Sequence, residues 1–402
     1  MKTRAFLTGI LALAFCINTI STKVLSAPAE VIATTKSTFA PIGKCQLLLP
    51  KVIYAVPGQE TNIYFDNVVL EPVPGKYLFD VTCAKGDQQT GRWTWTPTEK
   101  EAGDYPLQIE VRDMDDNILA TGGTSIHVAK ADAGTGKPIK VLCIGDSLTA
   151  ASVYTGELAK LGSASNNPQI TLLGTTGPGS GNVHEGYGGW RYETFLDKWV
   201  ANPAPDAAAN LKSSPFLFME NGKPTFDFPR YLKEKLNGET PDYVTIMLGT
   251  NDVFGATDDN RTDTVESMIG YANTLIAGIR AALPNAKIAI LPPVPPNQSQ
   301  DAFGANYHSG QTRWGYRKNQ FLADLRLMQV FGDREKENLF LVPAYTNLDC
   351  AHNFPYASVA VNARNATKVE RGANGVHPAA PGYLQIADSI FGWLKSQTEN
   401  SH

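Results

Sequence analysis

Between residues 138 and 398 the apolar residues come in short runs, with longer stretches of helical pattern between them. The runs occupy residues 139–144, 170–173, 243–248, 288–291 and 339–342. Short apolar runs separated by helix-length segments predict parallel strands that helices cover on both faces. Apolar residues recur at helical spacing from Val265 to Leu283 and again from Tyr383 to Leu394, which predicts two of these helices. This part of the chain is therefore predicted to be a three-layer α/β domain.

Residues 38–130 follow a different pattern, in which apolar and polar residues alternate. Apolar side chains fall two positions apart over residues 107–111, and a turn sequence rich in Asp and Asn follows at residues 115–117. Strands and turns at such short intervals predict an all-β, immunoglobulin-like sandwich. Residues 131–137 are small, polar and glycine-bearing, and are predicted to link this sandwich domain to the α/β domain.

The first 29 residues have the composition of a secretory signal peptide. Basic residues at positions 2 and 4 precede an apolar core at residues 6–20, and Ala27-Pro28-Ala29 supplies the small residues of a cleavage site. The apolar core is short for a bilayer span, and no later segment is apolar for long enough. We therefore expect a secreted or periplasmic protein without a membrane span, the alternative being an uncleaved anchor.

Charge and cysteine content narrow the possible partners further. The formal net charge is −4, and removal of residues 1–29 makes it more negative because that segment is basic. A negative balance disfavours nucleic acid as a partner. Among the four later cysteines a disulfide between Cys45 and Cys83 is predicted, although three full pairings are open, and Cys143 is predicted to be a buried free thiol. No cysteine spacing resembles a zinc site, so no metal is expected.

The candidate chemistry begins where the apolar run at residues 139–144 ends in Gly145-Asp146-Ser147. A helical pattern begins at once after it, so Ser147 lies at the carboxyl end of a parallel strand. Ligands bind at this edge of α/β sheets, and the first N–H groups of a helix are unpaired there. Ser147 is therefore a candidate nucleophile, and the alternative is a cap of the following helix.

Three more polar stretches supply the other groups that acyl transfer to a serine requires. They are residues 184–190, 248–252 and 374–378. The serine needs a base with a pKa near neutrality, which His377 can provide. The reaction also needs donors for the developing oxyanion, and the N–H groups of Ser147 and Gly189 with the amide of Asn251 are candidates.

The residues of these four stretches, and their order along the chain, resemble the conserved blocks of the SGNH (GDSL) hydrolase family of serine esterases and acetylesterases. The segment Gly145–Thr149 resembles the first block of the family, Gly189 stands at the place of its oxyanion glycine, and residues 249–252 and 376–378 resemble its last two blocks. The resemblance covers about residues 138–396. It implies an SGNH-type hydrolase fold, with no metal or cofactor.

The resemblance also implies roles for individual residues, and it shows one position at which this chain differs from the family. It implies that Ser147 is the nucleophile and His377 its base, with Ser147, Gly189 and Asn251 forming the oxyanion hole. The family usually has an aspartate three residues before the histidine, where this chain has Asn374. An asparagine can orient an imidazole but offers no negative charge to its cation.

Three interpretations of this departure stay open. The site is a Ser-His dyad with Asn374 as the orienting group, or it uses a replacement acid such as Glu185 or Asp349, or the chain is an inactive descendant. An active enzyme is favoured because the serine, the histidine and the oxyanion asparagine are all present. His184, Tyr187 and Trp190 flank the oxyanion glycine and are candidate substrate contacts.

Together these features predict an exported serine esterase that removes small acyl groups, foremost O-acetyl groups, from carbohydrate. Export, the companion β-domain and the lack of an apolar lid favour a small acyl ester on a polysaccharide as substrate. The alternatives are a lipid esterase or thioesterase of the same fold, and a catalytically inactive glycan-binding protein.

Overall fold

The computed structural model describes residues 45–70, 75–202, 204 and 207–399. The predicted signal peptide and the first residues of the predicted sandwich domain lie outside the described residues. From Cys45 onward the chain forms one unit in which the β-rich N-terminal region and the α/β region are in contact. The boundaries predicted between the two domains therefore stay a prediction.

A seven-stranded sheet forms the centre of the α/β region. Its strands are all parallel except the edge strand β10. In the sheet they follow the order β10 (Thr176–Gly179), β11 (Asn182–Gly186), β8 (Pro138–Gly145), β14 (Tyr243–Met247), β15 (Lys287–Leu291) and β16 (Leu339–Leu341), and β9 (Gln169–Leu173) also pairs with β8. The central strand β14 is buried along its whole length, as its unbroken apolar run predicts.

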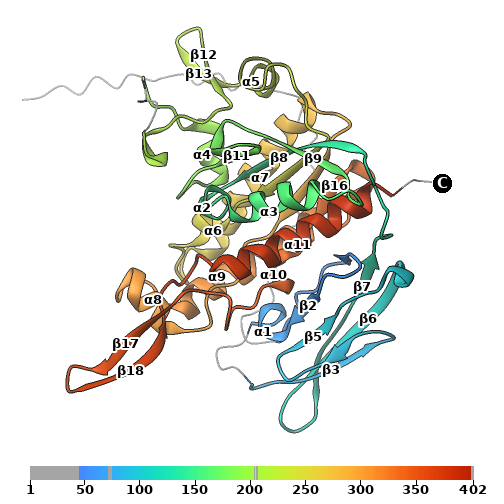
Figure 1. Ribbon diagram of the computed structural model, residues 1–402. Coiled ribbons are helices and arrows are strands. Elements are labelled where there is room, and N and C mark those ends of the chain that lie inside the picture. The colour runs from blue at the N-terminus through green and yellow to red at the C-terminus, as the bar shows by residue number, and fades with distance from the viewer. Residues whose placement is uncertain (1–44, 71–74, 203, 205–206, 400–402) are drawn as a thin grey trace, which may run out of the picture. The chain divides into compact units, whose positions relative to one another are not determined.

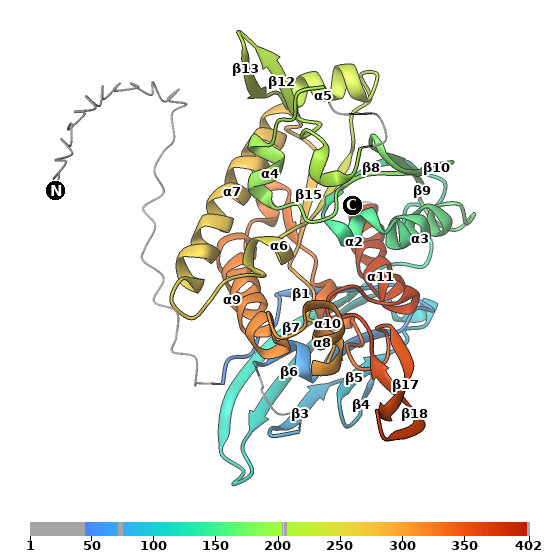
Figure 2. The same ribbon diagram turned by 90° about the vertical axis from the view of Figure 1, so that its left-hand side faces the viewer.

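Helices cover both faces of this sheet, which confirms the predicted α/β arrangement. Figures 1 and 2 show α3 (Val153–Gly162) and α11 (Ala380–Gln397) on one face and α7 (Arg261–Ala282) and α9 (Arg313–Phe331) on the other. The smaller helices α4 (Tyr192–Asp197) and α5 (Phe228–Lys235) pack against α7. Helices α7 and α11 correspond to the two helices predicted from apolar spacing.

The N-terminal region contains two small sheets. One has the strand order β1 (Val52–Ala55), β7 (Ile118–Val128), β6 (Gly103–Arg112) and β3 (Leu78–Cys83), and the other β2 (Thr61–Tyr64), β5 (Arg92–Trp95) and β4 (Asp87–Gln88). Apart from the short helix α1 (Phe65–Val68), its described elements are strands and one 3-10 turn. The predicted β structure is confirmed, whereas the immunoglobulin-like topology stays a prediction.

Buried contacts join this β region to the α/β region. Phe321 of α9 and Tyr345 of α10 (Ala344–Asn347) belong to the apolar core of the β region. The fully buried Arg317 of α9 donates three hydrogen bonds to the backbone carbonyls of Asp66, Asn67 and Val69. Because backbone carbonyls need partners when buried, these bonds tie the segment after β2 to α9.

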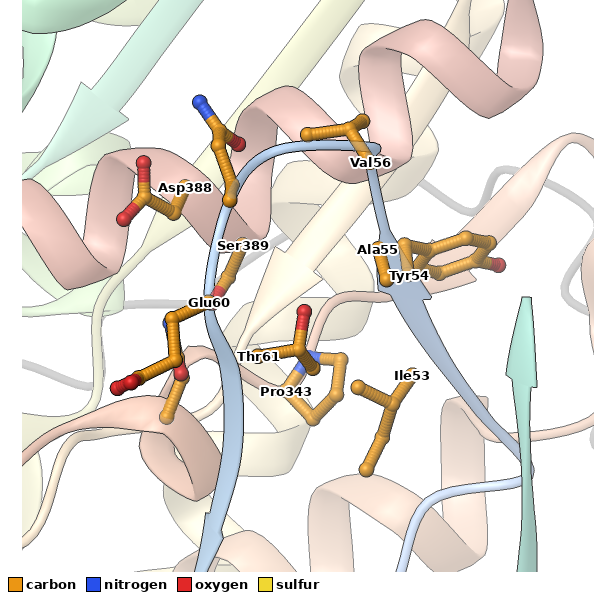
Figure 3. A pocket seen from close by; sticks show the side chains of 11 residues that line it. Ile53, Tyr54, Ala55, Val56, Glu60, Thr61, Pro343, Asp388 and Ser389 are labelled. Atoms are coloured by element: carbon orange, nitrogen blue, oxygen red, sulfur yellow. The ribbon is translucent and has the colours of Figure 1, made fainter. Parts of the chain in front are cut away.

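A small cavity lies within the contact between the β region and the α/β region, where β1 and β2 meet α11 (Figure 3). Its volume of about 10 Å³ is close to what one water molecule requires. Tyr54, Glu60 and Asp388 are among its lining residues. Burial, with a contribution from Glu157, raises the pKa of Asp388 to about 7.

Two antiparallel hairpins outside the central sheet were not predicted from the sequence, and neither was the antiparallel pair β10 and β11 within that sheet. One, β12 (Leu217–Glu220) with β13 (Lys223–Phe226), lies within the proline-rich segment before α5. The other, β17 (Tyr356–Asn362) with β18 (Asn365–Gly372), projects beside α8 (Gln300–Tyr307), as Figure 1 shows. None of the described helices combines the length and the apolar character that crossing a bilayer requires.

The state of the cysteines in the structure contradicts one prediction and confirms another. Cys83 carries a free thiol, so the disulfide predicted between Cys45 and Cys83 is not formed in this structure. Cys143 is a free thiol buried within β8, as predicted. Burial raises the pKa of the Cys143 thiol to about 11, which leaves it unreactive near neutral pH.

Candidate active site

Ser147 begins the short helix α2 (Ser147–Ala150) directly after β8. The turn between them requires a glycine at position 145, because a Cβ atom there would overlap the Thr149 side chain and come within 2.9 Å of the Met247 carbonyl oxygen. Asp146 caps α2 by accepting a hydrogen bond from the Leu148 N–H at 2.9 Å. The cap predicted as the alternative role of Ser147 is thus made by its neighbour, and the Ser147 hydroxyl remains available for chemistry.

His377 lies in the loop before α11 and reaches Ser147 across 230 positions of the sequence. Its Nε2 atom is 2.8 Å from the Ser147 Oγ. Burial lowers the pKa of His377 below its ordinary value, so the ring is neutral at pH 7. A neutral imidazole at this distance can accept the serine proton.

Asn374 supports the loop of His377 and does not contact its ring. The Asn374 Oδ1 accepts hydrogen bonds from the Val376 N–H at 3.0 Å and the His377 N–H at 2.8 Å. Within the described residues, the only hydrogen-bond partner of the His377 ring is Ser147. The structure therefore places Asn374 as a cap of the loop backbone, which corrects the hypothesis that it orients the imidazole directly.

Neither predicted replacement acid reaches His377. Glu185 is fully buried and accepts hydrogen bonds from the hydroxyl groups of Tyr187 and Tyr231 at 2.6 and 2.7 Å. Asp349 accepts instead from His352 Nδ1 at 3.0 Å. The structure therefore contradicts the hypothesis of an acid supplied by either residue.

The predicted oxyanion residues gather beside Ser147. Gly189 follows β11 with a φ of +80°, a left-handed conformation that glycine adopts without strain. In the same turn, a Cβ atom built on Gly188 would lie 3.9 Å from the Ser147 Cβ. Asn251 of α6 (Thr250–Val253) donates through Nδ2 to the Trp190 carbonyl at 3.0 Å, which places its amide beside this turn.

A family model for the GDSL-like Lipase/Acylhydrolase family matches residues 143–384, which is more than half of the chain. The protein belongs to this family. Family membership makes it a carboxylic ester hydrolase of the SGNH type. A comparison with curated proteins gives no match.

A comparison with solved structures finds several esterases that are similar to part of this chain. A family 3 carbohydrate esterase of Clostridium thermocellum is 15% identical, with a TM-score of 0.37, over 63% of this chain and 94% of that chain. A carbohydrate acetylesterase from Sinorhizobium meliloti is 17% identical, with a TM-score of 0.33, over 64% of this chain and 99% of the other. An acetyl xylan esterase is 17% identical, with a TM-score of 0.36, over 64% of this chain and 100% of that chain.

Two buried carboxyl groups lie behind the GDSL serine and were not among the predicted site residues. Burial raises the pKa of Asp146 and that of Asp252 to about 7 each. Asp146 Oδ2 accepts from Asn251 Nδ2 at 3.3 Å, and Asp252 Oδ1 accepts from the Tyr192 N–H at 3.2 Å. Asp146 thus holds both the start of α2 and the candidate oxyanion amide, as expected for a residue that ties loops together.

The three candidate substrate contacts of this GDSL-like site serve its internal structure instead. His184 Nδ1 accepts from the Gly186 N–H at 3.0 Å, so its Nε2 carries the proton and donates to Ser152 Oγ at 2.8 Å. Tyr187 and Trp190 stack with ring centroids 4.0 Å apart and are buried. These side chains pack beneath the glycine turn and expose almost no surface to a substrate.

Proposed function

We propose that the protein is an exported serine esterase that removes small acyl groups, foremost O-acetyl groups, from carbohydrate through an acyl-enzyme on Ser147. The observation that carries the proposal is the 2.8 Å approach of His377 Nε2 to Ser147 Oγ beside the glycine turn. The family match supports an ester as the substrate.

In the first half of the reaction His377 Nε2 takes the proton of Ser147 while Oγ attacks the ester carbonyl carbon. The carbonyl oxygen becomes negative and is stabilised by the N–H groups of Ser147 and Gly189 and by the Asn251 amide. Each such donor contributes on the order of 10²- to 10³-fold to the rate in serine hydrolases. The C–O bond to the leaving alcohol then breaks, and the alcohol takes the proton from His377.

In the second half a water molecule gives a proton to His377 and attacks the acyl-enzyme. The carboxylic acid leaves, and Ser147 regains its proton from His377. Among the described residues no carboxylate forms a hydrogen bond with the His377 ring, and the shift of its pKa comes from burial, so the cation formed in each half is stabilised without a third charged partner. We therefore infer that the site works as a Ser-His dyad.

The exposed surface supports a small acyl group. Long acyl chains require an apolar cleft next to the nucleophile. The exposed large apolar residues of the described chain are Leu78, Met114, Ile118, Leu119, Trp199, Leu211, Met219, Tyr271, Tyr356 and Leu384. None of them belongs to the four stretches that form the site. An acetyl group needs no such cleft, and the signal-like N-terminus and the attached β region fit an exported enzyme that acts on a polysaccharide.

The test is a series of 4-nitrophenyl esters from acetate to octanoate, measured with the wild type and with Ser147→Ala. We expect kcat/KM to be highest for acetate and to fall by at least about a thousandfold in Ser147→Ala. Ser163→Ala is a matched control, because the Ser163 hydroxyl donates to a backbone carbonyl, that of Lys160, at an exposed position after α3, and it should retain activity.

Two outcomes would replace the proposal with another function. A kcat/KM that rises with chain length would indicate a lipid esterase or thioesterase. Wild type and Ser147→Ala that are equally inert, while both bind polysaccharide, would indicate a non-catalytic glycan-binding protein.

A further inference from the structure

An open pocket with a volume of about 540 Å³ lies at the base of the β17–β18 hairpin. Its lining residues are Gln298, Ser299, Ala351, His352 and Tyr356. None of them has a role in the proposed reaction. Figure 2 shows the hairpin and α8 below α2 and the adjoining end of α11.

The wall of this pocket is hydrogen-bonded to the loop that carries His377. Ala373, before this loop, donates its N–H to the Pro355 carbonyl at 2.8 Å, and Ala379, after it, donates to the Asn353 carbonyl at 2.9 Å. The segment that contains His352 and Tyr356 therefore braces both ends of the loop. A ligand in the pocket would lie against the same backbone that positions the candidate base.

Two polar side chains of the pocket are held so that they present hydrogen-bond acceptors. Asp349 accepts from His352 Nδ1 at 3.0 Å, so in the neutral ring Nε2 is an acceptor. The His352 side chain is 82% exposed. Gln298 donates through Nε2 to Asp66 Oδ2, which leaves its Oε1 as a second acceptor.

Tyr356 adds an aromatic surface in a defined orientation. Its hydroxyl donates to the Ala351 carbonyl, and the residue is 41% exposed. No Lys or Arg lines the described pocket, so it offers an anion no fixed cation. A held ring beside hydrogen-bond acceptors matches a sugar unit, whose hydroxyl groups donate and whose C–H face packs on an aromatic ring.

We propose that this pocket is a subsite for a sugar unit of the acylated glycan, bound apart from the unit that carries the ester. The proposal rests on the proposed function of the Ser147 site and deepens it. It also gives the β region a role, because Asp66 holds Gln298 and the Tyr64 hydroxyl lies 3.4 Å from Asp349 Oδ2. The β region thus supports the two acceptors of the subsite.

The test compares kcat/KM for short O-acetylated xylo-, manno- and gluco-oligosaccharides with kcat/KM for 4-nitrophenyl acetate, which has no sugar. For the preferred oligosaccharide, Tyr356→Ala should lower the ratio of the two values about tenfold, as loss of a tyrosine contact of about 1.4 kcal/mol would. His352→Ala should lower the same ratio, and Tyr356→Phe, which keeps the ring, should retain most of it. Tyr271→Ala is the matched control, because Tyr271 is 37% exposed on α7 outside the pocket, and it should leave the ratio at its wild-type value.

The outcomes separate the subsite from the esterase. A ratio that stays at its wild-type value in both Tyr356→Ala and His352→Ala overturns the subsite, and so does a wild type whose kcat/KM is the same for an acetylated monosaccharide as for every acetylated oligosaccharide. In both cases the esterase stands as long as hydrolysis of 4-nitrophenyl acetate depends on Ser147. If the wild type hydrolyses no ester, the proposed function fails and the subsite fails with it.

Discussion

His377 works in this site with a single side-chain partner. Its Nε2 faces Ser147 Oγ, and the group that supports its loop, Asn374, bonds to the backbone. A carboxylate behind an imidazole raises its pKa and stabilises the cation formed during the reaction. Without one, burial dominates and lowers the pKa of His377. The enzyme therefore has a base that stays neutral into the acidic range but gives a less stabilised cation.

The first prediction concerns the pH dependence of the wild type. The reaction needs neutral His377, so the acid limb of kcat/KM reports the pKa of this ring in the free enzyme. Since burial lowers that pKa, the limb should have its midpoint below the ordinary histidine value of about 6.5. Rates of 4-nitrophenyl acetate hydrolysis across the acidic range measure it, and a midpoint above 6.5 would contradict this view of the site.

The second prediction is that Asn374→Asp moves this limb to higher pH. The new carboxylate can accept the same two N–H groups, so the loop is kept, and its negative charge favours the protonated imidazole. Above the new pKa the rate should rise, because the cation in the transition state is stabilised. Asn365→Asp is a matched control, because the Asn365 Oδ1 also accepts a backbone N–H, from Thr367, within the exposed hairpin. A limb that stays in place in Asn374→Asp would show that another acid already serves the ring.

Ser147 and Asn251 each follow a predicted parallel strand, and carboxyl ends of parallel strands meet at one sheet edge, so these two can be placed together from the apolar pattern. Gly189 follows β11, which the apolar runs did not predict, and His377 lies in the loop before α11, so these two were placed by the resemblance to the family. The hydrogen-bond partners of Glu185 and Asp349 cannot be placed from the sequence. The Tyr231 hydroxyl reaches Glu185 across 46 positions and the Tyr64 hydroxyl reaches Asp349 across 285, and no local pattern encodes such contacts.

At the scale of elements, the turn after β11 depends on one buried carboxylate. Glu185 is the next-to-last residue of β11 and accepts hydrogen bonds from four donors, which are the N–H and hydroxyl of Thr175 and the hydroxyls of Tyr187 and Tyr231. Tyr187 stacks on Trp190, and Gly188 and Gly189 connect these two residues in the sequence. The hydrogen-bond network of Glu185 therefore fixes both ends of the turn that carries a candidate oxyanion donor.

The third prediction is that Glu185→Gln destabilises the protein by about 1–3 kcal/mol and lowers kcat. The amide nitrogen of glutamine faces groups that donated to the carboxylate, which leaves buried donors without an acceptor. Glu193→Gln is the control, because Glu193 also accepts a tyrosine hydroxyl, that of Tyr271, at an exposed position. Urea unfolding and ester hydrolysis measure the two effects, and equal stability of both variants would remove Glu185 as a support of the turn.

Long helices with an apolar stripe were predictable, whereas an exposed hairpin was not. Helix α7 carries an apolar stripe that faces the sheet, and its range of Arg261–Ala282 is close to the predicted one. Strand β17 has no buried residue, so its sequence carries no one-sided apolar pattern that selects a strand. The hairpin that forms the proposed subsite was therefore missed.

At the scale of the whole described chain, the β region and the α/β region share buried polar contacts as well as an apolar core. Arg317 donates to backbone carbonyls of the β region and to Gln320, which in turn donates to Asp324. Such a network is stable only when its members remain paired. The attached β region is thus expected to unfold together with the hydrolase region.

The fourth prediction is that Arg317→Met lowers the free energy of unfolding by about 3–5 kcal/mol, because it leaves buried carbonyls without donors and Asp324 without a neighbouring charge. Arg334→Met is the control, since Arg334 pairs with Glu337 at the surface, and it should change stability by less than about 0.5 kcal/mol. Denaturant unfolding followed by tryptophan fluorescence measures both. If Arg317→Met is as stable as Arg334→Met, the contact between the β region and the α/β region does not depend on the Arg317 side chain, which contradicts the prediction.

The central claim, that Ser147 is a nucleophile activated by His377, is tested most directly by labelling with diethyl 4-nitrophenyl phosphate. The serine oxygen would displace 4-nitrophenolate from phosphorus and form a stable phosphoester, with its proton passing to His377. We predict that peptide mass spectrometry finds one diethylphosphoryl group on Ser147, that esterase activity falls in proportion to labelling, and that His377→Ala labels far more slowly. Full activity in a labelled protein, or a label on another residue at equal rate in Ser147→Ala, would contradict the claim.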